Sequence, residues 1–259
     1  MKRKVLIIIS VIVLLVGVSV LLYPPVSKGI NTYKSERIVE DFKKDIEELN
    51  EKTTETSEAD TNSSSDGGDN TNEESAGQLD PQLIAQLYND LQKYNQDLYN
   101  NGQQDEFANS FIFEDPTVDL TKYGITNGII GCMSVPEIDL NLPIYLGANE
   151  GNMALGASQL NKTSAPIGGE NTNCAIAGHR GLPNQVMFDN IVYLTEGDDV
   201  YITNYWDNLH YKVIETKIID PDATNEILIE DNKDLLTLIT CHPYGYTSQR
   251  YLVICERVE

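Results

Sequence analysis

The sequence predicts a mainly-β protein in which a closed or nearly closed sheet follows an N-terminal helical region and a transmembrane helix. Three features lead to this prediction: an uncharged aliphatic run near the N-terminus, a helical stripe after residue 80, and short apolar runs from residue 129 onward. Short apolar runs broken by Gly, Pro, Asn and Asp are typical of a closed or nearly closed sheet. Examples of these predicted strands are Ile129–Val135, Asn173–Gly178, Asp199–Thr203, Tyr211–Ile219, Leu235–Thr240 and Tyr251–Val258.

Residues 5–23 are predicted to be a transmembrane anchor. The stretch from Val5 to Leu22 carries no charge, and as a helix it reaches about 27 Å, close to the hydrocarbon thickness of a bilayer. Residues 1–4 contain three positive charges and are expected to stay in the cytoplasm, so the remainder should lie outside the cell. A cleaved signal peptide is the alternative, but the run ends at residues 21–25, Leu-Leu-Tyr-Pro-Pro, without a small-residue cleavage site.

Two polar segments follow the anchor. Residues 24–50 predict a charged juxtamembrane helix. Residues 51–80 hold nine acidic residues and one lysine, so they predict a disordered acidic tether that cannot bury enough apolar surface to offset its ordering entropy. The net charge of −22 over the whole chain argues against a nucleic-acid partner, which would need a basic surface.

A helix is predicted from Pro81, with Asp80 as its N-cap, and it should end near residues 100–102, Asn-Asn-Gly. Apolar side chains recur there at intervals of three and four residues, which is the period of one helix face. The residues of this stripe are Ile84, Leu87, Tyr88, Leu91, Tyr94 and Leu98.

The four cysteines form no CxxC pair and no metal-binding spacing with the three histidines. Cys132, Cys174 and Cys255 lie in apolar runs and are expected to be small buried hydrophobic residues. Cys241 differs because it closes an apolar strand and precedes a turn-rich loop, so it would be rigidly held yet accessible. A thiol attacks as the thiolate, so a nucleophilic Cys241 needs a nearby base or cation.

His179 is the preferred partner for this cysteine. It lies between glycines at the end of a predicted strand, where the chain can turn and leave the ring accessible; the alternative is a solvated loop histidine. His242 is adjacent to Cys241, and neighbouring strand residues point to opposite faces, which argues against it. His210 is expected to be exposed on the polar side of a strand.

Arg250 begins the last predicted strand, nine residues after Cys241. A turn between two adjacent strands would bring the two side chains together. A permanently charged guanidinium with several donors could stabilise the oxyanion of a tetrahedral intermediate. The alternative is an ordinary surface cation near a strand end.

Several separated motifs resemble those of sortases. Residues 237–241, Thr-Leu-Ile-Thr-Cys, resemble the TLxTC signature; Arg250 falls at the family's Cys-to-Arg spacing; residues 178–183 resemble the GHRGLP stretch around the catalytic histidine. Residues 241–245, Cys-His-Pro-Tyr-Gly, are similar to the form typical of class C, the pilin-polymerising sortases. Further similar segments are Leu142–Tyr145, Thr163–Gly169 and Tyr23–Ser27.

The resemblance implies an eight-stranded β-barrel with short helices over residues 126–259. It implies that Cys241 attacks an LPXTG-like sorting signal to form a thioacyl enzyme, that His179 transfers the protons, and that an amine, in class C a pilin lysine, resolves the intermediate. Thr240 could shape the substrate pocket or be only a structural strand residue. No metal or organic cofactor is implied, and the catalytic domain is expected on a Gram-positive-type cell surface.

Class C sortases also resemble one another in a lid loop with an Asp-Pro-aromatic motif, expected here within residues 81–125. Asp115 and Pro116 match it, but Thr117 replaces the aromatic residue, so the plug should be weaker or use Phe111 or Phe113 instead. His242 also stands where class C usually has threonine, and the sequence ends after the last predicted strand, whereas many class C enzymes carry a C-terminal membrane helix.

Three other functions remain open at this point. A sortase could attach surface proteins to the peptidoglycan precursor instead of polymerising pilins. Water could replace the amine, which would make the protein an ordinary cysteine protease. A non-catalytic surface binding module would be unaffected by loss of Cys241.

Overall fold

The computed structural model describes residues 2–59, 79–103, 116–182, 185 and 187–258. The helices are α1 (Lys2–Ala59), α2 (Pro81–Asn100) and α3 (Glu150–Leu155), and the 3-10 turns are η2 (Leu120–Tyr123), η3 (Pro136–Ile138), η4 (Ile191–Tyr193) and η5 (Thr224–Ile227). The strands are β1 (Ile129–Val135), β2 (Leu140–Leu146), β3 (Ala157–Gln159), β4 (Thr172–Ala177), β5 (Asp199–Asn204), β6 (Asn208–Ile219), β7 (Asp234–His242) and β8 (Gln249–Arg257).

The strands of the described chain close into an eight-stranded barrel with the order β1-β2-β3-β4-β7-β8-β6-β5. Two neighbouring pairs, β2–β3 and β4–β7, are parallel, and the others are antiparallel. Closure leaves no free sheet edge, and fully buried side chains such as Ile130, Met133 and Ile144 belong to the core. The predicted barrel with short helices is confirmed.

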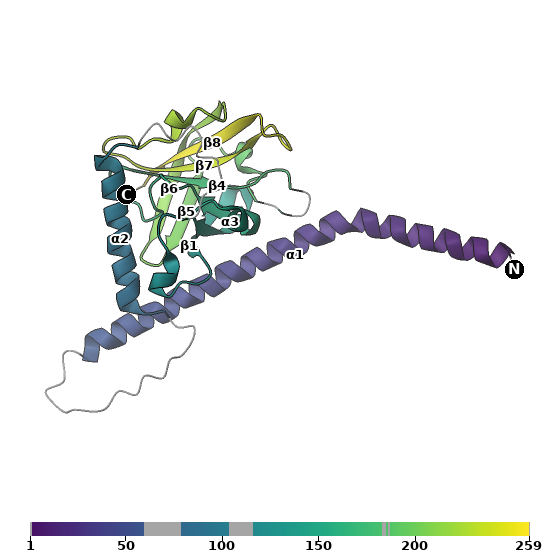
Figure 1. Ribbon diagram of the computed structural model, residues 1–259, viewed down its shortest axis with the longest axis horizontal. Helices are drawn as coiled ribbons and strands as arrows, with labels where there is room; N and C mark the ends of the chain where they lie inside the picture. Colours follow the sequence, from purple (N-terminus) through teal and green to yellow (C-terminus); the bar gives the residue numbers. More distant parts are fainter. Residues whose placement is uncertain (1, 60–78, 104–115, 183–184, 186, 259) are drawn as a thin grey trace.

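Helix α2 stands against one side of the barrel (Figure 1). The Asp80 carboxylate accepts a hydrogen bond from the N–H of Gln82 at 2.8 Å, as expected of an N-cap. Ile84, Leu87 and Leu91 are buried beneath the helix, which confirms the centre of the predicted stripe. The indole N–H of Trp206 donates to the carbonyl of Ile84 at 3.2 Å and ties the helix to the β5–β6 hairpin.

Helix α1 is continuous from the apolar run into the segment predicted to be a separate juxtamembrane helix. Its N-terminal part extends away from the barrel, whereas its C-terminal part runs along the barrel (Figure 1). One stretch of it, Arg3–Lys52, contains a window long and apolar enough to cross a membrane. The predicted segment boundary at residue 24 is therefore not visible as a break, although Pro24 and Pro25 lie within the helix.

The C-terminal part of α1 is amphipathic and packs on the barrel, which sequence analysis did not foresee. Val39, Phe42 and Leu49 are buried, and Ile46 packs against the same core. These positions recur at three and four residues, the spacing of one helix face. The ring of Phe42 meets Tyr205 edge-on, with centroids 4.9 Å apart. This segment is therefore a docked part of the barrel domain.

The predicted tether also begins later than expected. Helix α1 runs on to Ala59, because adding residues to an existing helix needs no new nucleation. Residues 60–78, the rest of the predicted tether, lie outside the described residues. Since α1 and α2 both pack on the same barrel, the acidic segment connects two docked helices and does not separate the barrel from the anchor.

Replacing Phe42 by alanine is expected to destabilise the domain. Removing a fully buried aromatic ring costs about 3 kcal/mol or more, which lowers the midpoint of thermal unfolding by roughly 6–12 °C for a domain of this size. Thermal unfolding of the full chain in detergent would measure this shift. Glu47→Ala, on the exposed side of the same helix, is the control; equal midpoints for the two variants would mean that α1 is not docked in solution.

Candidate active site

Cys241 and Arg250 are directly opposite each other in the antiparallel pair β7–β8. Directly opposite residues in such a pair have their side chains on the same side of the sheet. Both residues are half-buried. The Arg250 guanidinium is held by the loop between the two strands, because its Nη1 donates to the carbonyls of Thr247 at 2.9 Å and Gln249 at 3.0 Å.

His179 lies just beyond the end of β4, which runs parallel to β7. The N–H of Gly178 continues this ladder by donating to the carbonyl of Ile239 at 3.1 Å. A side chain at Gly178 is impossible without rearrangement, since its Cβ would lie 2.6 Å from the ring of Phe188. Phe188 in turn donates its N–H to the carbonyl of His179 at 3.0 Å, so the backbone of the histidine is held from both sides.

Thr240 connects the two strand ends. It is 2% exposed, and its hydroxyl donates to the carbonyl of Gly178 at 2.7 Å. This hydrogen bond runs from the residue before Cys241 to the residue before His179. Thr240 therefore has a structural role at this position, and it also lines the cavity described next.

Cys241, His179 and Arg250 line one cavity of about 300 Å³. Sequence analysis placed these three residues together, and the structure brings them to the same hollow. The remaining wall is largely aliphatic, with side chains from Ala148, Met153, Leu160, Ala177 and Ile239. The site thus combines a thiol, an imidazole and a guanidinium with an apolar surface.

Burial lowers the pKa of the His179 imidazole below its ordinary value, because a desolvated ring disfavours the charged form. A neutral imidazole has a free nitrogen lone pair and can accept a proton from a thiol. Among the residues that the structure describes, no group of three or more His, Cys, Asp or Glu side chains could hold a metal ion.

The other two histidines lie away from this cavity. The His242 ring contacts Arg180 and lies 5.9 Å from the ring of Tyr251, in keeping with the argument that neighbouring strand residues face opposite sides. His210 was predicted to be exposed, but it is half-buried: its Nε2 lies 2.7 Å from a carboxylate oxygen of Asp199, and its ring stacks on Tyr201.

The remaining cysteines behave as predicted. Cys132, Cys174 and Cys255 are buried, with 3% or less of each residue exposed. Burial raises the pKa of all three thiols, so they stay protonated and unreactive. Cys241 is the only cysteine of the described chain that is not buried.

The predicted lid is only partly within the described residues. Asp115, Phe111 and Phe113 lie outside them. Pro116 packs on the backbone of Gly147, where an added Cβ would approach its Cα to 2.6 Å. Thr117 is exposed, and it does not line the cavity of Cys241. A plugging role for this loop stays a prediction.

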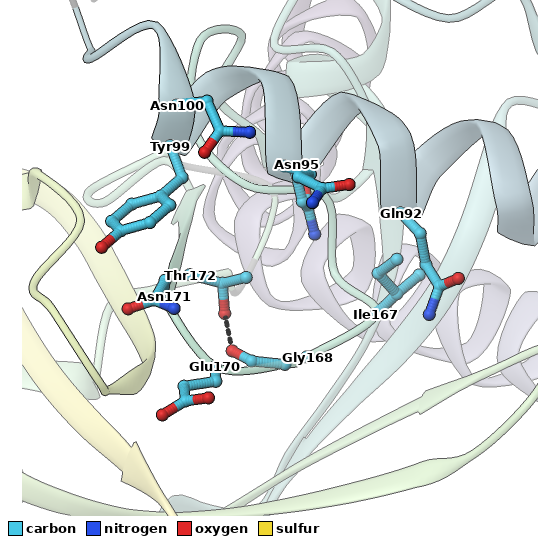
Figure 2. A pocket seen from close by; sticks show the side chains of 11 residues that line it. Gln92, Asn95, Tyr99, Asn100, Ile167, Gly168, Glu170, Asn171 and Thr172 are labelled. Atoms are coloured by element: carbon cyan, nitrogen blue, oxygen red, sulfur yellow. Dashed lines mark hydrogen bonds between the residues drawn. The ribbon is translucent and has the colours of Figure 1, made fainter.

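A second hollow, of about 430 Å³, is larger than the cavity of Cys241. Figure 2 shows Gln92, Tyr99 and Asn100 of α2 on one side of it and the loop from Ile167 to Thr172 on the other. The loop is held by a hydrogen bond of 2.6 Å from the Thr172 hydroxyl to the carbonyl of Gly169. This hollow contains carboxamides but neither a cysteine nor a histidine, so it lacks the groups for acyl transfer.

Known proteins with similar sequences are consistent with a site built from a cysteine, a histidine and an arginine. The family model of the sortase domain matches residues 133–258. Sortase A of Listeria monocytogenes is 30% identical over 168 residues, which cover 62% of this chain and 72% of that protein.

Solved structures give the same result. Sortase C-1 from Streptococcus pneumoniae is 31% identical, with a TM-score of 0.62 and coverage of 70% of this chain and 92% of that chain. The structure of Clostridium perfringens sortase C with the C-terminal cell wall sorting motif is 35% identical, with a TM-score of 0.60 and the same coverage. The chain therefore belongs to the sortase family of cysteine transpeptidases, with class C sortases among its structural neighbours.

Proposed function

We propose that this protein cleaves an LPXTG-like sorting signal and transfers the resulting acyl group to an amine, most simply a pilin lysine. The observation that carries this proposal is the single cavity lined by Cys241, His179 and Arg250. Similarity to class C sortases supports the choice of acceptor, since one similar structure is of a pilus-related sortase C of Group B Streptococcus, 31% identical with a TM-score of 0.61.

In the first half-reaction, Cys241 Sγ attacks the carbonyl carbon of the scissile Thr–Gly bond, and His179 accepts the thiol proton. The carbonyl oxygen becomes an oxyanion, which the Arg250 guanidinium stabilises. When the C–N bond breaks, His179 returns the proton to the leaving amine. The products are a thioester on Cys241 and a free amino terminus.

In the second half-reaction, a neutral amine attacks the thioester carbonyl, and His179 accepts the proton that the amine loses. The C–S bond then breaks, an amide forms, and the thiol of Cys241 is regenerated. The aliphatic wall of the cavity supports a sorting signal with an apolar side chain near the scissile bond, because burying that side chain is favourable.

The proposed location is the cell surface, with residues 5–23 as a single-pass anchor. The N-terminal position of the apolar helix supports this, and three positive charges precede the run, which favours a cytoplasmic N-terminus. The barrel would then act on substrates that are themselves on the outer face of the membrane.

Trapping the acyl-enzyme would test the proposal. The full chain in detergent is incubated with sorting peptides of varied sequence, and the thioester and the final product are identified by mass spectrometry. Transfer to a lysine of a pilin fragment supports pilus assembly, and transfer to an oligoglycine-type amine indicates anchoring to the peptidoglycan precursor, as similarity to sortase A would favour. Hydrolysis that outpaces transfer at physiological amine concentrations would contradict a transpeptidase.

The acid limb of the pH profile is expected below pH 6.5. His179 must be neutral to accept the thiol proton, and burial lowers its pKa from the ordinary value of 6.5, so the neutral form persists to lower pH. Measuring kcat/KM against pH would locate this limb. A limb above pH 6.5 would contradict the role given to the buried imidazole.

A further inference from the structure

Two loops meet beside the cavity: the one that carries His179 and the one that follows Cys241. The side chain of Arg180 lies between them. Its Nη1 is 3.3 Å from His242 Nδ1 and 3.5 Å from the carbonyl of Cys241. Its Nε donates to the carbonyl of Asp189 at 3.3 Å.

Further contacts order the loop of His179 and hold it against the loop after Cys241. Within the first loop, the Asp189 carboxylate accepts a hydrogen bond of 2.8 Å from the N–H of Gly181. Gly181 has a φ of +85° and lies so close to the other loop that an added Cβ would be 2.9 Å from the N of Gly245. The Arg180 guanidinium also lies 5.6 Å from the centre of the Tyr244 ring, within the range of a cation–π contact.

We propose that Arg180 is a positioning residue for the reaction, and that His242 is its main partner across the two loops. Arg180 directly follows His179, and His242 directly follows Cys241. A bridge between Arg180 and His242 therefore restrains His179 and Cys241 on their C-terminal sides. The Thr240–Gly178 hydrogen bond restrains the same two residues on their N-terminal sides. Arg180 does not line the cavity itself; it reaches Cys241 only at the backbone carbonyl and acts on the reacting groups by positioning them.

The bridge requires a particular form of His242. A guanidinium only donates hydrogen bonds, so Nδ1 of the ring must accept, which leaves the proton on Nε2 of a neutral imidazole. The other groups around the bridge are the rings of Tyr251 and Tyr244 and, through Gly181, the Asp189 carboxylate. The bridge therefore depends on an acceptor at residue 242.

This inference rests on the proposed transpeptidation, and rates of acyl-enzyme formation test it. Arg180→Ala is expected to lower kcat by about 10- to 100-fold with a smaller change in KM, because misplacing reacting groups by about 1 Å can cost 10²-fold. Arg180→Lys should recover part of the rate, since it keeps a charged donor but not the planar fork. Arg257→Lys, an arginine of β8 paired with Asp207, is the matched control and should leave the rate unchanged.

A double-mutant cycle tests the partner. His242→Ala should lower the rate in the wild-type background and have little effect in the Arg180→Ala background, because the bridge is already absent. His242→Gln, which keeps an acceptor, should retain most of the rate.

The outcomes separate the two proposals. A wild-type chain that forms no thioester with any sorting peptide would contradict the proposed function itself. A wild-type chain that is active, with equal rates for Arg180→Ala and wild type or additive effects in the cycle, would overturn the bridge alone. If Arg180→Ala unfolds, as thermal unfolding would reveal, the rates of Arg180→Lys and His242→Ala still decide, and wild-type rates for both variants would overturn the bridge.

Discussion

A Cys241→Ala variant is expected to form no thioester with a sorting peptide and to lose transfer activity by roughly 10⁴-fold or more. The methyl group cannot attack a carbonyl, and the other cysteines of the described chain are buried with raised thiol pKa values, so none can substitute for it. Intact-mass spectrometry of the enzyme after incubation with peptide would show the missing adduct. Cys241→Ser should also be inactive, because a neutral hydroxyl is a much weaker nucleophile than a thiolate.

The matched control for this experiment is Thr216→Ala, on an exposed position of β6, which should acylate at the wild-type rate. Thermal unfolding of both variants should be close to that of the wild type, since Cys241 is only half-buried. An adduct on the Cys241→Ala variant would reject this residue as the nucleophile, and a wild-type chain that binds the peptide without forming an adduct would favour the interpretation as a binding module.

An Arg250→Ala variant is expected to lose about 10²- to 10³-fold in kcat, the usual cost of removing one donor to an oxyanion. The loss should fall on kcat more than on KM, because the oxyanion exists only in the transition state and the intermediate. Steady-state kinetics with a fluorogenic sorting peptide would separate the two parameters.

Arg250→Lys is expected to recover only part of this loss. The arginine uses Nη1 to bind two carbonyls of the β7–β8 loop, and a lysine cannot hold this geometry and face the substrate with further donors. Arg257→Lys on the same strand serves as the control. A change in KM alone for Arg250→Ala would indicate that the guanidinium binds the substrate and does not stabilise the oxyanion.

Much of the barrel could be predicted from the sequence because strands such as β1 and β7 are largely apolar runs between turn residues, and β5 alternates between buried and more exposed residues. The predicted segment Ile129–Val135 coincides with β1, and the predicted run Leu235–Thr240 lies within β7. The missed strands had weaker signals. β2 contains Pro143, which normally argues against a strand, and β3 has only three residues, too few to show a period. The apolar face of α1 was hidden among many charged residues.

The three proposed catalytic residues could be predicted because each has a recognisable local context. Cys241 lies at the end of a strand, His179 lies in a glycine-flanked turn, and Arg250 lies at the start of the strand that pairs with that of Cys241. Arg180 could not be found in this way. Its contacts with His242 and Tyr244 join segments far apart in the chain, and the parallel pairing of β4 with β7 brings these segments together. The signal available in the sequence was an arginine next to a candidate catalytic histidine.

The unbroken course of α1 has a consequence for the proposed anchor. The helix from Tyr23 to Val39, the first buried residue of α1, is about 24 Å long. If residues 5–23 lie in the bilayer as proposed, this length would hold the cavity of Cys241 at a fixed distance from the lipid surface. Under the proposed function, the number of residues between a sorting signal and its own membrane segment would then become a criterion of selection.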